Sequence, residues 1–547
     1  MNFIDWYKQK HGYEPFPWQI DLADRMAKGI IPSSITVPTG CGKTVIIAVF
    51  AWLHEEGLPC PKRLIYVVDR RLIVDSVTEY AEKRIDCSVV KMKGGMTIDD
   101  SWMVEIDKPI VIVSTVDQAG SRLLFRGYGV SNRTAPIHAA LIGNDALIVL
   151  DEAHISTPFA NTLESIKKLR GESSPWHVTQ MTATPVDKSN TIRLSKEDWS
   201  HEVLKRRLLA SKKTELVKTT RKQLIKVMVE KAGHLHKEVS GVVGVICNNV
   251  QNARQVFNAL SGKKILLTGR IRPYDRDKIL GEYLETILCG NRDGREPMFV
   301  VATQTIEVGA DLDFDALVTQ NAPLDVLRQR FGRLDRVGAL GKSVAVIVHE
   351  ALSANEECYV YGKKILKETF TWLNKSQKGK GRDKFVDFGL SAMEKSMNAI
   401  QPPLRKVDDG VPLTPMDILR LRQTLPRAKI DIAPYLHGDQ VDDISVSVVW
   451  REDLYPERGE KEGNEKDWPK IMEVSPPVLM ESMPCPVYAV KWWVWDRKVI
   501  IDGEVKIVVE DQVEILSLGD ALYLKSTTPH IVITSTDKPA LILAIMY

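Results

Sequence analysis

The chain has 547 residues, of which 44% are hydrophobic, and a formal net charge of +3 at pH 7. This length exceeds what a single hydrophobic core usually organises, so we expect two or three domains in a globular protein. Because the charge is nearly neutral, composition excludes a protein-wide positive field. Any nucleic-acid contact must therefore come from local basic surfaces.

Cysteine spacing and the N-terminal residues indicate a compartment. Seven cysteines, at positions 41, 60, 87, 247, 289, 358 and 485, form no C-x-x-C pair. This argues against a disulfide framework and a zinc ribbon, and it fits a reducing cytoplasm, where we expect the protein. The N-terminus lacks a basic segment followed by an apolar one, and no run approaches the ~18 apolar residues of a membrane span. We therefore predict no membrane partner.

The first 200 residues read as one α/β lobe. Short β-branched apolar runs alternate there with helical stretches, and these runs are 35–37, 64–68, 110–114, 147–150 and 178–182. Such alternation predicts a parallel sheet with crossover helices.

The pattern restarts in a second α/β lobe, which we assign to residues 201–350. Its predicted strands are 241–247, 264–267, 298–302, 317–318 and 344–348. A charged stretch, 195–237, separates the two sets and is predicted to be helical.

Residues 351–547 form a predicted accessory region of α+β or β-rich character. A helix is expected over 359–372, followed by a linker at 375–384 that carries five basic residues and one acidic residue. The last sixty residues alternate like short antiparallel strands at 487–495, 498–501, 505–509 and 531–533.

A phosphate loop is predicted at Pro38-Thr39-Gly40-Cys41-Gly42-Lys43-Thr44, between a strand and a helix over 45–53. Glycines let backbone N–H groups approach phosphates, Lys43 would reach the β and γ oxygens of ATP, and Thr44 would offer its hydroxyl to Mg²⁺. The strict G-x-x-x-x-G-K-[ST] pattern has glycine where this chain has Val37. A tight turn between strand and helix is the alternative, and Cys41 is most simply a small loop residue.

Two adjacent carboxylates, Asp151 and Glu152, end the predicted strand that begins at Ala146. The carboxyl ends of parallel strands are where α/β sheets bind ligands. Asp151 would hold Mg²⁺, directly or through water, and Glu152 would position and deprotonate the attacking water. Together with the phosphate loop, this pair predicts an ATPase.

These motifs resemble those of superfamily 2 helicases of the DEAH type. The first lobe has Asp151-Glu152-Ala153-His154 followed by Thr182-Ala183-Thr184, and the second has Gln329 to Arg336, similar to that superfamily's Q-R-x-G-R-x-x-R motif. The resemblance implies two tandem RecA-like P-loop lobes. Cations delivered from a second lobe stabilise the transferring phosphoryl group only on closure. Arg333 and Arg336, in the motif that Gln329 opens, are the candidate arginine fingers.

Further segments match the superfamily. Gln19, in Phe16-Pro17-Trp18-Gln19, resembles its adenine contact, although it could simply cap the following helix. The segment 303–311 resembles the element that joins the nucleic-acid track to the ATP site, with Gly309 and Asp311 at the nucleotide and Thr303 or Thr305 at the strand's backbone. Other predicted phosphate contacts stand at strand ends or helix starts, where each could equally be a cap: Arg70, Arg71, Thr115, Asn248 and Thr268.

Within the superfamily, the sequence is most similar to the type I CRISPR interference helicases. The likeness covers about residues 10–455 and rests on the strings 114–118, 121–129, 138–145, 329–336, 432–438 and 448–451. It implies ATP-driven translocation on single-stranded DNA, 3′ to 5′, which unwinds target DNA opened by a guide-RNA interference complex. Two alternatives stay open, an RNA helicase of the DEAH type and a nucleotide-gated scaffold.

The chain departs from this family in one respect. Many members carry an HD nuclease, which needs a His-Asp pair, yet none of the eleven histidines here is followed by aspartate. We therefore predict no nuclease activity in this chain and expect a separate HD-type nuclease as a partner; a nuclease domain removed from this chain is the alternative.

Overall fold

The structure is a computed structural model. It describes residues 1–69, 71–94, 101–128, 130–171, 175–182, 190–288, 292, 295–304, 312–352, 360–403, 405, 409–424, 430–438, 445–449, 474–475, 478–486, 505–509, 512–516 and 530–534. Its contacts divide the chain into two units. The first comprises Met1–Thr268 with Tyr283–Gln440, and the second comprises Gly269–Glu282 with Val441–Tyr547.

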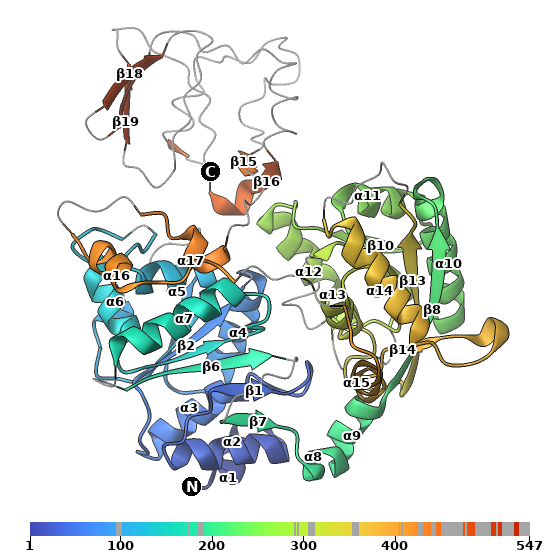
Figure 1. Cartoon of the computed structure of the whole chain (residues 1–547), viewed down its shortest axis with the longest axis horizontal. Coiled ribbons are helices and arrows are strands. Elements are labelled where there is room, and N and C mark those ends of the chain that lie inside the picture. The colour runs from blue at the N-terminus through green and yellow to red at the C-terminus, as the bar shows by residue number, and fades with distance from the viewer. Residues whose placement is uncertain are drawn as a thin grey trace. The chain divides into compact units, whose positions relative to one another are not determined.

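The first lobe is built on a seven-stranded parallel sheet of order β3-β4-β2-β5-β6-β1-β7 (Figure 1). In chain order the strands are β1 (Ser34–Thr36), β2 (Arg63–Val68), β3 (Ser88–Met92), β4 (Ile110–Thr115), β5 (Ala146–Leu150), β6 (Trp176–Thr182) and β7 (Thr191–Arg193). The five predicted strands are confirmed. Both additional strands, β3 and β7, are short edge strands whose sequences carry weak periodicity.

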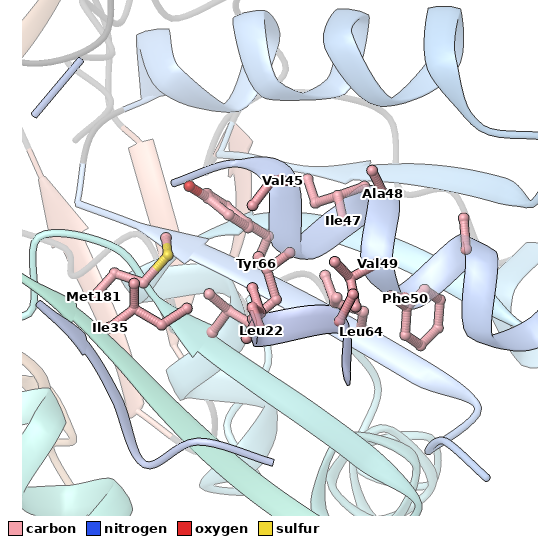
Figure 2. Close-up of a cluster of buried hydrophobic side chains, with 14 of the residues drawn as sticks. Leu22, Ile35, Val45, Ile47, Ala48, Val49, Phe50, Leu64, Tyr66 and Met181 are labelled. Carbon is pink, nitrogen blue, oxygen red and sulfur yellow. The ribbon is translucent and has the colours of Figure 1, made fainter. Parts of the chain in front are cut away.

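Helices cover both faces of this sheet. They are α1 (Phe3–His11), α2 (Pro17–Ala27), α3 (Val45–Glu55), α4 (Arg71–Arg84), α5 (Val116–Leu123), α6 (Ala135–Gly143) and α7 (Thr157–Arg170). Because side chains alternate along a strand, Leu64 and Tyr66 of β2 pack with α2 and α3, whereas Ile65 and Val67 pack with α5 and α7. Figure 2 shows the first of these layers, in which Val45 to Phe50 of α3 lie over Leu64 and Tyr66.

The second lobe repeats the plan with a seven-stranded sheet of order β10-β11-β9-β12-β13-β8-β14. Its strands are β8 (Ser211–Thr219), β9 (Val242–Ile246), β10 (Lys264–Leu267), β11 (Met298–Ala302), β12 (Ala316–Gln320), β13 (Lys342–Glu350) and β14 (Val386–Asp387). All pairings are parallel except that of β14 with β8. Two α/β lobes in one chain, each built on a seven-stranded sheet, confirm the predicted fold class.

The helical prediction for 195–237 is wrong in its middle. Helices α8 (Lys196–Ser200), α9 (Glu202–Leu209) and α10 (Leu224–Val239) flank β8, which pairs with β13 over nine residues. The charges of β8 hid its period of two, because buried Lys212 and Thr214 alternate with exposed Lys213 and Glu215. The high density of charged residues in 195–237 therefore led to a helical prediction for residues that form a strand.

Helices cover the second sheet as well and continue beyond it. They are α11 (Val250–Ala259), α13 (Leu324–Phe331), α14 (Lys363–Lys375) and α15 (Leu390–Ala399), whereas α12 (Pro273–Ile287) has most of its residues in the second unit. The helix predicted over 359–372 corresponds to α14, which begins after Gly362 because that residue has a φ of +68°. The predicted linker at 375–384 is largely exposed and leads into β14.

The chain then returns to the first lobe with α16 (Pro415–Leu421) and α17 (Ala433–His437). Thr162 of α7 donates a 2.7 Å hydrogen bond to the Tyr435 carbonyl, and Arg126 donates one of 2.7 Å to the Leu421 carbonyl. Leu436 fills the space above Gly120 of α5, where a Cβ would come within 2.4 Å of it. Helices α16 and α17 of the predicted accessory region therefore pack onto the helices of the first sheet, whereas its strand β14 joins the second sheet.

The second unit contains antiparallel strands. β15 (Ser445–Val449) pairs with β16 (Ser482–Pro486), and β17 (Val505–Val509) lies between β18 (Gln512–Leu516) and β19 (His530–Thr534). The strands predicted at 505–509 and 531–533 are confirmed, and those at 487–495 and 498–501 lie outside the described residues. No helix in the described ranges combines the length and apolar character that crossing a bilayer requires.

Packing at Gly244 of β9 supplies a stability test. A Cβ there would lie 2.6–2.9 Å from ring atoms of Phe314, which is fully buried. Gly244→Ala is expected to lower the free energy of unfolding by about 1–3 kcal/mol, because an enclosed ring has little room to move. Urea denaturation measures this. Gly233→Ala on α10, where an added Cβ meets nothing within 4 Å, is the control, and equal midpoints for both variants would contradict the packing.

Candidate nucleotide site

The predicted phosphate loop runs from the end of β1 into α3. Gly40 and Gly42 have φ values of +86° and +81°, a region that glycine adopts without strain. Val37, at the position where the strict pattern has glycine, is a fully buried core residue. Burial raises the pKa of the Cys41 thiol to about 12, so this residue is an uncharged part of the loop. Pro38 and Thr39 precede the first glycine and are partly exposed.

Gln19 ties this loop to α2. Its side chain accepts a 2.8 Å hydrogen bond from the Phe16 N–H and donates one of 3.1 Å to the Gly42 carbonyl. A Cβ on Gly42 would lie 2.7 Å from the Gln19 amide nitrogen, so glycine is required at this approach. Gln19 thus makes the helix-capping contact that the sequence left open as an alternative. Its predicted role at adenine remains a prediction.

The two carboxylates at the end of β5 meet the phosphate-loop lysine. Lys43 Nζ lies 2.9 Å from Glu152 Oε1 and 3.9 Å from Asp151 Oδ1. All three side chains are largely buried, with 8%, 14% and 16% exposure for Lys43, Glu152 and Asp151. Glu152 has a φ of +47°, an uncommon conformation for a non-glycine residue and one typical of functional sites.

The charge states of this cluster follow from burial and pairing. Burial alone would lower the pKa of Lys43, but attraction to Glu152 and Asp151 outweighs it and the pKa is raised. Burial would raise the pKa of Glu152, and Lys43 reverses this to give a lowered value. Burial raises the pKa of Asp151. Lys43 is therefore held as a cation beside an ionised Glu152.

Tyr66 is a neighbour of this cluster that sequence motifs did not mark. Its hydroxyl donates a 2.9 Å hydrogen bond to Asp151 Oδ2, and the Thr44 side chain is a further polar neighbour of this phenol. Thr44 and Asp151 are therefore both neighbours of the Tyr66 phenol. They present hydroxyl and carboxylate oxygens, the ligand types that Mg²⁺ prefers. The donor set fits the predicted magnesium site.

His154 connects the carboxylates to the second lobe. Its Nδ1 lies 3.5 Å from Glu152 Oε2 and 3.4 Å from the Thr182 hydroxyl, and its Nε2 lies 3.3 Å from the Gln329 amide nitrogen. Burial lowers the pKa of His154, so the ring is neutral at pH 7. A neutral ring that accepts from Gln329 carries its proton on Nδ1, on the side of Glu152.

Two arginines approach the phosphate loop from beyond the first sheet. Arg207 of α9 donates a 2.7 Å hydrogen bond to the Gly40 carbonyl. A Cβ on Gly40 would lie 3.5 Å from the Arg336 carbonyl and 3.9 Å from Arg336 Cγ. Arg336 therefore lies against the loop, as a candidate finger should. Arg207 was missed because a single arginine in a charged helix carries no motif.

Arg330 and Arg333 of the arginine motif are both buried, with 0% and 6% exposure. Arg330 donates hydrogen bonds to the Thr319 hydroxyl at 2.8 Å, the Gln320 carbonyl at 3.1 Å and the Asn248 side chain at 3.0 Å. Asn248, a predicted phosphate contact, also donates to the Asn321 carbonyl at 2.9 Å. Arg330 thus organises the interior of the second lobe.

The other predicted nucleic-acid contacts are buried in this conformation. Thr115, Thr268 and Thr303 are 3%, 5% and 3% exposed, and Thr115 caps α5 by accepting a 3.4 Å hydrogen bond from the Gln118 N–H. Their contacts with a strand remain predictions. Four predicted site residues lie outside the described residues: Arg70, Thr305, Gly309 and Asp311. Of Arg71, only the backbone is described.

Family models match three parts of the chain. Residues 12–187 match the type III restriction enzyme res subunit, and residues 239–339 match the C-terminal region of CRISPR-associated nuclease/helicase Cas3. Residues 499–546, for which the sequence alone offered no match, match the cupin domain.

Individual relatives agree with the two helicase matches. The chain is 35% identical over 98 residues to the CRISPR-associated helicase Cas3 of Thermoproteus tenax and 34% identical over 102 residues to the CRISPR-associated nuclease/helicase Cas3 of Streptococcus thermophilus. These alignments cover 17% and 18% of this chain. They cover only 16% and 11% of those proteins.

Solved structures share the fold over a longer stretch. T. fusca Cas3 with AMPPNP superposes with a TM-score of 0.59 at 17% identity, covering 89% of this chain and 65% of that one. A chain of the pre-nicking CRISPR RNA-guided surveillance complex superposes with a TM-score of 0.51 at 17% identity, covering 86% and 63%. The chain thus spans about two thirds of the length of these solved relatives. The chain shares the two-lobed fold of these Cas3 structures, and its second lobe is similar in sequence to the C-terminal region of CRISPR-associated Cas3.

Proposed function

We propose that the chain is an ATP-driven motor that moves 3′ to 5′ on single-stranded DNA and unwinds target DNA in type I CRISPR interference. The observation that carries this proposal is the buried cluster of Lys43, Asp151 and Glu152, joined through His154 to Gln329 of the second lobe. A cluster of this kind couples a nucleotide to two lobes at once. A motor requires that coupling.

The cluster assigns a task to each residue. Lys43 attracts the β and γ phosphates of ATP, and the backbone N–H groups of 40–44 cradle them. Glu152, kept ionised by Lys43, accepts the proton of the attacking water. Thr44 and Asp151 would hold Mg²⁺, which neutralises charge on the phosphate oxygens when bound. When ATP draws Lys43 toward its phosphates, Glu152 exchanges part of its ion pair with Lys43 for contact with water.

The second lobe completes the site. Arg336 lies against Gly40 and Arg333 belongs to the same turn, which supports a role for both in stabilising charge on the transferring phosphoryl group. Gln329 contacts His154 at 3.3 Å, and the His154 ring in turn lies 3.5 Å from Glu152. Because these groups come from a different sheet than Lys43, hydrolysis depends on how the two lobes meet, and lobe movement can be converted into steps along a strand.

Partners follow from the relatives. Likeness to a chain of a CRISPR RNA-guided surveillance complex supports a guide-RNA interference complex as the partner that opens the DNA. Single-stranded DNA is then the substrate, held mainly through its backbone and with little sequence preference. Cleavage would come from a separate HD-type nuclease.

Nucleic-acid stimulation of ATP hydrolysis tests the substrate. We expect single-stranded DNA to raise the phosphate-release rate and single-stranded RNA of the same sequence to raise it far less. Stimulation by RNA alone would favour the RNA helicase of the DEAH type. ATP binding without turnover, with either strand, would favour the nucleotide-gated scaffold.

A further inference from the structure

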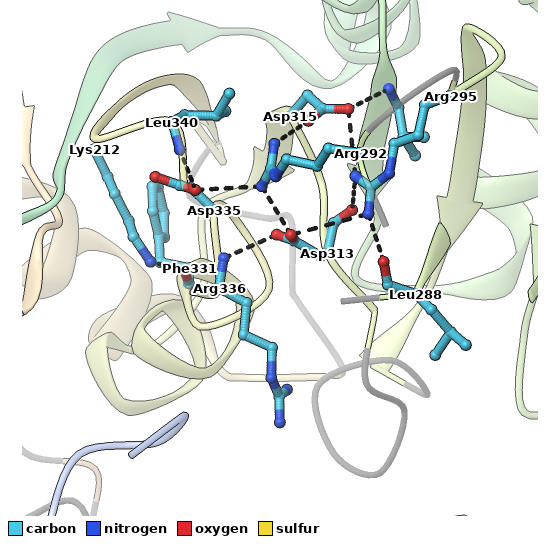
Figure 3. A network of polar contacts seen from close by, with 11 residues as sticks. Lys212, Leu288, Arg292, Arg295, Asp313, Asp315, Phe331, Asp335, Arg336 and Leu340 are labelled. Atoms are coloured by element: carbon cyan, nitrogen blue, oxygen red, sulfur yellow. Dashed lines mark hydrogen bonds and ion pairs between the residues drawn. The ribbon is translucent and has the colours of Figure 1, made fainter. Parts of the chain in front are cut away.

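A buried group of five charged residues lies behind the arginine motif of the second lobe. This arginine–aspartate cluster consists of Arg292, Arg295, Asp313, Asp315 and Asp335 (Figure 3). Asp313 and Asp335 are 0% and 1% exposed. Burial of an isolated carboxylate is costly, so such residues persist in a core only when cations and hydrogen bonds surround them.

Arg292 is the hub of the arginine–aspartate cluster. One terminal nitrogen of its guanidinium lies 2.8 Å from Asp313 and 3.2 Å from Asp335, and the other bonds Asp315. Arg295 lies 3.9 Å from Asp313 and 3.5 Å from Asp315, and it donates a 2.9 Å hydrogen bond to the Asp313 carbonyl. A planar guanidinium with fixed donors suits this shared role, which a lysine could not fill in the same geometry.

The arginine–aspartate cluster hydrogen-bonds to the turn at 333–336, which carries the candidate arginine fingers. Asp313 accepts a 2.8 Å hydrogen bond from the Arg336 backbone N–H. The main chain of Phe314 brackets the preceding residues, since its N–H donates to the Arg333 carbonyl at 2.8 Å and its carbonyl accepts from the Asp335 N–H at 3.0 Å. Three hydrogen bonds to the main chain of 333–336 thus come from Asp313 or its neighbour Phe314, in addition to the local turn bonds of this segment.

The turn at 333–336 has an uncommon backbone conformation. Asp335, between the two candidate fingers, has a φ of +42°. A non-glycine residue in this region persists when its surroundings over-determine it. The Asp335 side chain supplies such restraint, because it pairs with Arg292 and accepts a 3.0 Å hydrogen bond from the Leu340 N–H. Lys212 of β8 adds a further restraint by donating a 2.8 Å hydrogen bond to the Phe331 carbonyl.

We propose that Asp313 and Arg292 are positioning residues for ATP hydrolysis: they set the backbone of the 333–336 turn so that Arg333 and Arg336 reach the phosphates. Neither residue is proposed to touch the nucleotide. This inference rests on the proposed function, because it presumes that the two arginines act in hydrolysis. It predicts a loss of turnover without a matching loss of ATP affinity.

The first experiment measures kcat and KM for ATP in the presence of single-stranded DNA. Asp313→Asn keeps the side-chain size but weakens the pairing with Arg292, and it should lower kcat by about 10–100-fold because small misplacements of catalytic groups carry such effects. KM should change by less than about threefold, since ground-state binding is preserved. Lys231→Ala, which removes a surface pair with Glu215 in the same lobe, is the matched control and should match wild type.

A mutant cycle separates positioning from general damage. If Asp313 acts through Arg333 and Arg336, then Asp313→Asn should change kcat by less than about twofold in a background that carries both Arg333→Ala and Arg336→Ala. Equal losses in both backgrounds would overturn the inference, as would a wild-type kcat for Asp313→Asn. Should Asp313→Asn fail to fold, Arg292→Lys, which keeps a positive charge, carries the same expectations. A wild-type protein without ATPase activity would instead refute the proposed function.

Discussion

Replacing Glu152 with glutamine will lower the rate of ATP hydrolysis by about 10²–10⁴-fold, the contribution of a positioned general base. Glutamine has nearly the same shape and can still accept a hydrogen bond from Lys43, so the phosphate loop keeps its structure. It has no basic carboxylate for the proton of the attacking water. ATP binding should therefore survive the substitution.

Two measurements separate these effects for Glu152→Gln. Phosphate release at saturating ATP and DNA gives the turnover, and titration with a fluorescent ATP analogue gives the affinity. Glu79→Gln removes a surface carboxylate that pairs with Lys83 on the same lobe, and it should behave as wild type. Unchanged phosphate release by Glu152→Gln would show that the base has been wrongly assigned.

Replacing Arg336 with alanine will lower DNA-stimulated ATP hydrolysis by about 10³-fold or more, as expected for a finger that meets charge on the transferring phosphoryl group. The physical reason is its location, because Arg336 reaches the phosphate loop at Gly40 while belonging to the second lobe. Arg336→Lys should restore little, since an ammonium group cannot reproduce the planar fork of a guanidinium.

Stopped-flow phosphate release measures the Arg336→Ala effect. Arg254→Ala, at an exposed position of α11 in the same lobe, is the control for loss of one positive charge. If Arg336→Ala turned over ATP at the control's rate, the second lobe would contribute no catalytic charge through this residue. Contact between the lobes at Gly40 would then be a packing contact alone.

The motifs were readable from sequence because each occupies one short stretch. Strand periodicity predicted the two sheets, and the position of Asp151 and Glu152 directly after a predicted strand indicated the strand end that carries them. The structure brings Lys43 and Glu152, which are 109 residues apart, to 2.9 Å. Parallel strands made this proximity predictable, since their carboxyl ends share one edge.

The residues that support the motifs through tertiary contacts could not be predicted from the sequence. Tyr66 reaches Asp151, Arg207 reaches Gly40, and Arg292 reaches three aspartates, each through packing between segments that no pattern links. Strand β8 was missed because its charged residues, among them the buried Lys212, disguised its buried face. Side chains that act through tertiary contacts leave no local signal, and they include the residues proposed here to position the fingers.

The measurement that most directly tests the motor is strand displacement on a DNA duplex with a 3′ single-stranded tail, by wild-type and Lys43→Ala protein. We predict displacement that requires ATP, that fails on a duplex with only a 5′ tail, and that Lys43→Ala abolishes. Lys43→Ala should lose it because the phosphate loop then lacks its lysine cation and Glu152 loses its ion pair with Lys43. Displacement by Lys43→Ala at the wild-type rate, or none by a wild-type protein that hydrolyses ATP, would contradict the account.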